Sequence, residues 1–513
     1  MLFLKFILAM IPIIWLIIAL SKLKMPSYKA CGIALIITVV LAVTYWKLNI
    51  VHTSTAALEG VLNALWPICL VIIAALFTYN LTLKTGAMDS IKKMLAGISD
   101  DKRILMLIIG WGFGNFMEGM AGFGTAVAIP ASMLAGIGLD PIRAVTACLV
   151  VNSTPTAFGS VGVPTTTLGT VSGLELGALS ANVALIQAIL TFLSPFFMVV
   201  ICGKGIKALK GVFRITLIAS LSFVIPWFAA AWWLGPELPD IIGSICSMLC
   251  MIAAIKIFKK DTNKEYSIEI ADTEKSNIGF AEGVKAWAPF VLIFVLLTVT
   301  STAVPPIHNA IKGIKSSFLI YTGQGGKPLG FSWVNTPGVI IFIAAICGGL
   351  IQKASFAEIF SVFGATLKKY WTTIFTICAV MAVAKIMIYS GMISDIANLL
   401  VATTGPFYPF VSPIIGVLGA FVTGSGTSTC VLFGGLQSQT ALSLGLNTYW
   451  ITAANVMGAG IGKMVCPQGL AIGAGAVNAA GSESKILSAV FKYFVVYTLF
   501  AGVICLVGAL IHI

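Results

Sequence analysis

Apolar stretches of roughly 17–27 residues recur along the whole chain, and each is long enough to cross the hydrocarbon core of a bilayer as a helix. The 513 residues are 58% hydrophobic and only 10% charged, whereas soluble domains carry about 25% charged residues. Strands of a membrane barrel would alternate apolar and polar residues over about ten positions, a pattern that this sequence lacks. The chain is therefore predicted to be an all-α polytopic membrane protein.

Twelve transmembrane helices are predicted from the apolar stretches. They cover residues 2–20, 29–46, 58–83, 142–170, 176–203, 212–234, 239–257, 286–303, 336–351, 370–389, 449–473 and 486–511. The first is expected to be a retained helix rather than a signal peptide, because no small-residue cleavage site follows it.

Two further apolar stretches, 104–138 and 407–445, are interrupted at their centres by glycine clusters. Glycine costs about 1 kcal/mol relative to alanine at a helical position, so a helix is expected to break there. We expect each stretch to form a re-entrant hairpin surrounded by protein or by a watery cavity, since lipid does not tolerate non-helical backbone. A pair of ordinary spanning helices at each place is the alternative.

The second half of the chain repeats landmarks of the first half in the same order. Trp66 and Trp371, Gly86 and Gly391, Gly114 and Gly419, and Phe116 and Phe421 are each 305 residues apart. The run Gly122-Phe123-Gly124-Thr125 matches Gly424-Ser425-Gly426-Thr427, and Asn152 and Pro164 match Asn455 and Pro467. Duplicated halves with glycine-interrupted apolar segments are typical of secondary transporters.

Basic residues indicate that the two copies have opposite orientations. The segment 66–86 leads into a loop with Lys84, Lys92, Lys93, Lys102 and Arg103, whereas its copy 371–391 leads into 392–406, which has no basic residue. Cytoplasmic loops are enriched in Lys and Arg, so the first copy is predicted to run inward and the second outward. This placement of charge in loops also argues against nucleic-acid binding, despite a net charge of +13.

The predicted organisation has three parts. Residues 1–206 form a first inverted-topology repeat with the hairpin 104–138 and a broken helix at 142–170. Residues 207–285 supply two linking helices and a cytoplasmic loop. Residues 286–513 form the second repeat with the hairpin 407–445 and a broken helix at 449–473. The eleven cysteines are scattered singly and show neither metal-ligand spacing nor a disulfide framework.

Two ionisable residues lie inside apolar, glycine-broken stretches. Glu118 lies in the first hairpin and Lys463 in the second broken helix, where the other copy has Ser160. Charged groups at membrane depth need partners and mark functional sites. Lys463 is expected to pair either with a substrate carboxylate or with Glu118, in a pair that is structural or that opens when substrate arrives. Glu118 is expected either to carry a proton or to serve as a structural hydrogen-bonding group.

At these positions the sequence resembles the bacterial L-lactate permease family. The likeness rests on the run 118–124, the run 152–159 with Pro164, and the run 462–464 with Pro467 and Gln468, and it covers essentially the whole chain. The resemblance implies proton-coupled uptake of L-lactate, D-lactate and glycolate across the cell membrane. It further implies an elevator-type fold of inverted repeats and hairpins, which is often dimeric.

We expect a secondary transporter of small monocarboxylates that needs no cofactor and no metal. Lys463 and the two Gly-x-Gly-Thr turns, together with four amide or hydroxyl side chains and Gln468, are expected to bind substrate, and Glu118 to take up the coupled proton. The substrate set is Lys463, Gly122, Gly124, Thr125, Asn152, Ser153, Thr154, Gly424, Gly426, Thr427, Asn455 and Gln468.

Three alternatives remain at this stage. A sodium-coupled carrier of another organic anion would keep the fold, because the hydroxyl-rich run 424–429 and broken-helix carbonyls can ligate sodium. A channel would need a continuous polar path, whereas the polar residues cluster at two breaks. An intramembrane enzyme is disfavoured, because Ser425 has no histidine within the broken spans to activate it.

Overall fold

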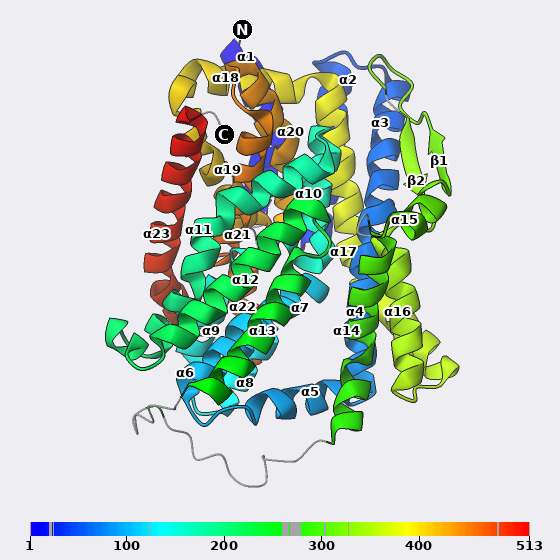
Figure 1. Cartoon of the computed structure of the whole chain (residues 1–513). Coiled ribbons are helices and arrows are strands. Elements are labelled where there is room, and N and C mark those ends of the chain that lie inside the picture. The colour runs from blue at the N-terminus through cyan, green and yellow to red at the C-terminus, as the bar shows by residue number, and fades with distance from the viewer. Residues whose placement is uncertain are drawn as a thin grey trace.

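The computed structural model of the chain describes residues 2–19, 23, 25–122, 124–258, 266, 279–301, 304–326, 328–479 and 482–511. Phe123 of the first glycine run, Lys22, Lys24, Lys327 and most of the predicted cytoplasmic loop lie outside these residues. Within them, nearly all residues belong to helices (Figure 1). The all-α prediction is confirmed apart from one short hairpin of two strands.

The helices of the first half are α1 (Leu2–Ile17), α2 (Ser27–Thr44), α3 (Ile50–Asn63), α4 (Leu70–Lys84), α5 (Ala87–Ala96), α6 (Lys102–Leu105), α7 (Gly114–Met120), α8 (Thr125–Gly136), α9 (Pro141–Val151), α10 (Gly159–Ser172), α11 (Leu176–Cys202), α12 (Phe213–Trp233) and α13 (Pro239–Ile257). Wider π-helical turns at Ala64–Cys69 and Met106–Phe113 continue into α4 and α7. Short 3-10 turns lie at Pro155–Phe158 and Ile206–Leu209.

The second half comprises α14 (Phe280–Thr300), α15 (Pro305–Lys312), β1 (Lys315–Phe318), β2 (Leu329–Ser332), α16 (Pro337–Ile351), α17 (Phe356–Ser390), α18 (Met392–Thr404), α19 (Tyr408–Thr423), α20 (Gly426–Leu444), α21 (Thr448–Lys463), α22 (Pro467–Ala476) and α23 (Glu483–Leu510), with a 3-10 turn at Gly405–Phe407. The strands are antiparallel, with Lys315 opposite Ser332 and Phe318 opposite Leu329.

Eight described helices are long and apolar enough to cross a membrane, and the bent pair α9–α10 makes up to nine. The predicted crossings 2–20, 29–46 and 336–351 correspond to shorter apolar helices, and 449–473 corresponds to α21 and α22, which separate at residues 464–466. A polytopic membrane fold is therefore confirmed, and the number of twelve crossings stays a prediction.

The predicted helix breaks are present at the glycine clusters. The stretch 104–138 turns between α7 and α8, and 407–445 turns between α19 and α20; in each case the two arms pack against each other. The segments 66–86 and 371–391 lead to opposite ends of the molecule, the first to α5 and the second to α18 (Figure 1). Gly86 and Gly391, which end these segments, both adopt left-handed backbone conformations, with φ of 75° and 88°.

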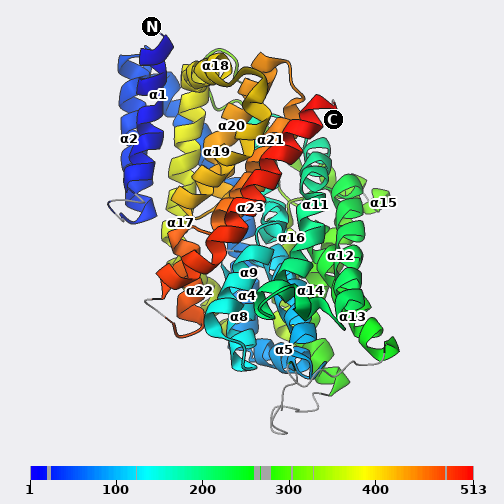
Figure 2. The ribbon, with the colours of Figure 1, turned by 90° about the vertical axis from the view of Figure 1, so that its left-hand side faces the viewer.

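Two long helical stretches pack together beside this region. The stretch Ile50–Lys84 and the helix α17 each contain 35 residues, and polar contacts join them near both ends. The Lys385 ammonium lies 2.8 Å from the Glu59 carboxylate, to which the Tyr389 hydroxyl also donates, and the Asn80 amide donates to the Thr366 hydroxyl at 3.0 Å. Helices α1 and α2 flank α17 and α18 along one edge (Figure 2).

We predict that Lys385→Met lowers the free energy of unfolding by about 3–5 kcal/mol, because it leaves the buried Glu59 carboxylate without its cation. The Glu59 and Lys385 side chains are only 4% and 14% exposed. The midpoint of thermal unfolding in detergent measures the effect. The double substitution Glu59→Gln/Lys385→Met should recover most of the loss, and a wild-type midpoint for the single variant would contradict the prediction.

Candidate functional site

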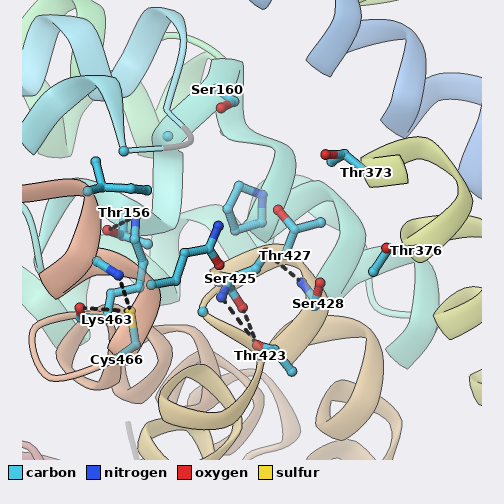
Figure 3. A pocket seen from close by; sticks show the side chains of 18 of the residues that line it. Thr156, Ser160, Thr373, Thr376, Thr423, Ser425, Thr427, Ser428, Lys463 and Cys466 are labelled. Atoms are coloured by element: carbon cyan, nitrogen blue, oxygen red, sulfur yellow. Dashed lines mark hydrogen bonds between the residues drawn. The ribbon is translucent and has the colours of Figure 1, made fainter. Parts of the chain in front are cut away.

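A polar cavity of about 390 Å³ lies where the helix breaks of both halves meet. Its wall includes the turn before α8, the break between α9 and α10, the turn between α19 and α20, and the break between α21 and α22. One face of the long helix α17 closes the remaining side. Figure 3 shows hydroxyl side chains from these elements around the space, with Lys463 on one side and Thr373 and Thr376 across from it.

The two hairpin turns depend on glycine. Gly122, Gly124 and Gly424 have φ of 58°, 86° and 68°, in the left-handed region that side chains disfavour. At the second turn the Ser425 hydroxyl accepts the amide hydrogen of Ser428 and caps α20. These turns place the N-termini of α8 and α20, which carry partial positive charge, at the cavity.

Each hairpin turn packs against the broken helix of the other half of the chain. A Cβ atom on Gly124 would lie 2.9 Å from the side chain of Ile472 in α22. A Cβ on Gly426 would lie 3.1 Å from Thr156, beside the break of the first half. This reciprocal packing holds segments that are about 300 residues apart in one small volume. It explains why glycines recur at both turns, since a larger residue would separate the elements.

At the break between α9 and α10 the two helix axes bend by 62°. Ser160, Val161 and Gly162 are successive residues with φ of 48°, 57° and 75°. Left-handed backbone in a β-branched residue such as Val161 is strained, and such strain clusters at functional sites. The Ser160 hydroxyl stabilises the break by donating to the Ala121 carbonyl at the first hairpin turn, at 3.0 Å.

The second broken helix crosses the first with almost no separation. α21 ends at Lys463, and α22 begins at Pro467, where a missing amide hydrogen is harmless. A Cβ on Gly460 would overlap the backbone oxygen of Ser153. The ends of the two broken helices are therefore in backbone contact next to the cavity.

Lys463 and Glu118 form an ion pair in the cavity wall. The Lys463 ammonium lies 3.0 Å from Glu118 Oε1 and also donates to the Thr156 hydroxyl at 3.1 Å. The other carboxylate oxygen accepts from the Asn152 amide at 3.1 Å. Glu118 is 3% exposed and Lys463 is 19% exposed, so the lysine is the more accessible of the two charged groups. Of the two partners expected for Lys463, the structure contains Glu118.

The structure gathers most of the predicted site residues around the cavity. Eight of the thirteen line it, namely Glu118, Gly124, Asn152, Gly424, Gly426, Thr427, Lys463 and Gln468. The other five lie in the surrounding layer and do not line it. Gly122 packs on Ser160, Thr125 and Ser153 bond the backbone at Gly122 and Val150, Thr154 faces Ser194 of α11, and Asn455 is fully buried.

Sequence reasoning missed the contribution of α17 and of the start of α2. Thr372, Thr373 and Thr376 project from α17, and Tyr28 comes from α2. Thr156 was within the polar run 152–160 but was not assigned a role, although it holds the Lys463 ammonium. Three threonines within five positions of the stretch 370–384, which has no charged residue, are a visible signal of a polar face. Nothing local, however, indicates what that face meets.

The arrangement is suited to reversible binding of a small anion rather than to chemistry on it. Its two charged lining residues are Lys463 and Glu118, and hydroxyl, amide and backbone groups supply the remaining polar contacts. Over the described residues, no three His, Cys, Asp or Glu side chains gather as a metal site. The volume is at the small end of the usual range for ligand sites.

Broken helices around an ionic pocket in a polytopic bundle define the class of multi-pass membrane transport proteins. The sequence model described as L-lactate permease matches residues 5–512, and the chain belongs to this family. The Streptococcus iniae L-lactate permease is 45% identical over 447 residues, covering 87% of this chain and 93% of that protein. The Escherichia coli K12 L-lactate permease is 33% identical, covering 97% and 94% of the two chains.

Two further likenesses extend this comparison. The Escherichia coli K12 protein named glycolate permease GlcA is 32% identical, covering 98% of this chain and 95% of that protein. The solved structure of Neisseria gonorrhoeae MtrF, described within a class of antimetabolite efflux pumps, covers 96% of this chain and 97% of that one, with a TM-score of 0.52 and 11% identity. The resemblance, the membrane localisation and the classification as a transporter rather than an enzyme are thereby confirmed.

We predict that Gly460→Ala abolishes folding or reduces the yield of monodisperse protein by more than about fivefold, because its methyl group would overlap the Ser153 backbone and well-packed interiors cannot absorb such overlap cheaply. Gly364→Ala is the matched control, since Gly364 is also inside a helix and has open space beside it. Size-exclusion chromatography of both variants measures the yield. Equal yields would show that the two broken helices are not in contact.

Proposed function

We propose that this protein takes up L-lactate and related short 2-hydroxy monocarboxylates, including D-lactate and glycolate, together with protons across the cell membrane. Relatives named L-lactate permease and glycolate permease support the substrate class. The observation that carries the proposal is the ammonium of Lys463, which lines a cavity with several hydroxyl groups and is more exposed than its counter-ion Glu118.

The cavity offers complementary groups for each part of a 2-hydroxy acid. The substrate carboxylate would bind Lys463 and the amide hydrogens at the start of α20. The 2-hydroxyl would bond to Asn152, Thr427 or Gln468, which line the same space. Gly122, Thr125, Ser153, Thr154 and Asn455 would then act by supporting these groups rather than by touching substrate.

Proton coupling follows from competition for one cation. A substrate carboxylate that binds Lys463 replaces Glu118, and a buried carboxylate that loses its cation is strongly disfavoured. Glu118 relieves this cost by taking up a proton, and its remaining hydrogen bond from Asn152 tolerates either form. Anion binding and proton binding therefore favour each other, which is thermodynamic coupling between two ligands.

Movement across the membrane would follow from two inverted repeats. The opposite directions of 66–86 and 371–391 and the paired breaks support this organisation, with parts bounded at 1–206, 207–285 and 286–513. We propose that both hairpins and both broken helices move as one unit against a scaffold that includes α17, in an elevator motion. Pairing of two copies through their scaffolds, as a homodimer, is part of the same proposal.

Sodium coupling is the second candidate, because four hydroxyl side chains lie close together at the turn between α19 and α20. Thr423, Ser425, Thr427 and Ser428 all line the cavity around the left-handed Gly424, and broken-helix carbonyls with hydroxyls can ligate sodium. Two of these hydroxyls already bond to the local backbone: that of Thr423 donates to the Gly419 carbonyl, and that of Ser425 accepts from the Ser428 amide. Because these hydroxyls are already engaged, the proton is favoured over sodium as the coupling ion.

The coupling ion can be determined in proteoliposomes loaded without lactate. We predict that an inward proton gradient drives accumulation of labelled L-lactate in sodium-free buffer and that collapsing the gradient with a protonophore abolishes it. A panel of 2-hydroxy acids as competitors defines the substrate class. Accumulation that requires an inward sodium gradient and ignores the proton gradient would establish the second candidate instead.

We predict that Lys463→Ala weakens L-lactate binding by about 30-fold or more, because removing one member of a buried charged contact costs about 2–5 kcal/mol. Uptake at substrate concentrations near the wild-type KM should become undetectable while the protein still reaches the membrane. Lys492→Ala removes an exposed lysine of α23 and serves as the control. Normal apparent affinity in Lys463→Ala would exclude Lys463 as the anion site.

A further inference from the structure

A second buried carboxyl group lies next to the ion pair, at the start of α13. Asp240 is 1% exposed. Its Oδ1 atom accepts a hydrogen bond from the Trp227 indole at 2.9 Å, and its Oδ2 atom has no hydrogen-bond partner among the described residues. The backbone of α7 packs directly on it, since a Cβ atom on Gly119 would lie 2.8 Å from Asp240 Cβ. Gly119 directly follows Glu118.

The charges around Asp240 indicate whether its carboxyl group can hold a proton. Lys463 of α21 and Glu118 of α7 are within electrostatic range of its carboxyl group, and Trp227 of α12 supplies the neutral donor. The single ammonium is already bound to Glu118. An ionised Asp240 would therefore be a buried anion with one neutral hydrogen bond, which is an unfavourable arrangement. With a proton on Asp240, the three groups sum to zero charge.

The chain just before α13 reaches a separate cavity of about 140 Å³, lined by Glu237, His308 and Asn335 together with Thr300 and Ser301 at the end of α14. Glu237 lies between α12 and α13, three residues before Asp240. Burial raises the pKa of its carboxyl group to about 7, which would allow it to bind and release a proton near neutral pH. A partly exposed titratable group therefore lies close in sequence to the buried acid.

We propose that Asp240 relays the coupling proton to Glu118. When substrate takes Lys463, the Oδ–H proton of Asp240 passes to the released Glu118 carboxylate. Asp240 then regains a proton either directly from water or from Glu237, which is in turn reprotonated from water. The net change is one proton gained per substrate anion, so the site stays neutral in both states. Asp240 acts through Glu118 and touches no substrate. This inference rests on the proposed proton-coupled uptake.

Asp240→Asn tests the relay because asparagine keeps the shape and an acceptor for Trp227 but cannot pass a proton. We expect exchange of labelled for unlabelled L-lactate at equal pH, which needs no net proton transfer, to stay within about twofold of wild type. Net accumulation driven by a proton gradient should fall by more than about tenfold. Trp227→Phe, which removes the hydrogen bond and leaves a smaller ring in place of the buried indole, should retain coupled accumulation.

The outcomes separate this inference from the proposed function. If the wild-type protein does not respond to a proton gradient, the proposed coupling fails whatever Asp240→Asn does. If the wild-type protein accumulates lactate and Asp240→Asn does so equally, the relay alone is wrong. Loss of exchange together with accumulation in a folded variant would also overturn it, because Asp240 would then be needed for binding.

A second variant covers the case in which Asp240→Asn does not fold. Asp240→Glu retains a titratable carboxyl group at a shifted position, so the rate of coupled uptake against pH should change while exchange persists. An unchanged pH profile would overturn the relay. Glu237→Gln should lower coupled uptake most above pH 7, where delivery of protons directly from water is slowest, and should leave exchange unchanged.

Discussion

The ion pair between Lys463 and Glu118 is the interaction on which the site depends. An ammonium and a carboxylate at membrane depth are tolerated only when they satisfy each other and when further donors complete their bonding. Thr156 and Asn152 supply these contacts, and both come from the break between α9 and α10. The pair therefore joins the first hairpin, the first broken helix and the second broken helix, which are elements of both halves of the chain.

Glycines allow these elements to pack closely, because they have no side chain at the points where the backbones cross. Gly460 admits the Ser153 carbonyl, Gly159 leaves room for the Glu118 carboxylate, and Gly119 admits Asp240. A polar pocket in lipid needs irregular backbone, and irregular backbone needs protein around it on all sides. Close packing at these glycines provides that enclosure, while the strained residues 160–162 turn the chain within it.

Much of this fold can be predicted from the sequence because the membrane restricts the possibilities. Long apolar runs must be helices, and clusters of glycine and proline within them must be breaks, so the breaks near Gly124, Pro164, Gly424 and Pro467 follow from local chemistry. Lys463 and Glu118 stand out for the same reason. Their mutual pairing stayed one of two possibilities, since distance between residues 345 positions apart is set by tertiary packing. The threonines of α17 and the buried Asp240 were missed on the same grounds, because an isolated polar residue at a helix start or on a helix face does not reveal its neighbours.

The cavity wall is divided between two kinds of element, with Lys463 on a broken helix and Thr376 on the long helix α17. If one of these slides past the other during transport, a cargo must be short enough to remain on the moving side alone. A 2-hydroxy acid with a rigid, bulky tail that reaches Thr376 while its carboxylate is held at Lys463 would span the boundary between these two elements. Such a compound would bind but prevent their relative movement. The same geometry would then limit the size of a substrate and define the shape of an inhibitor.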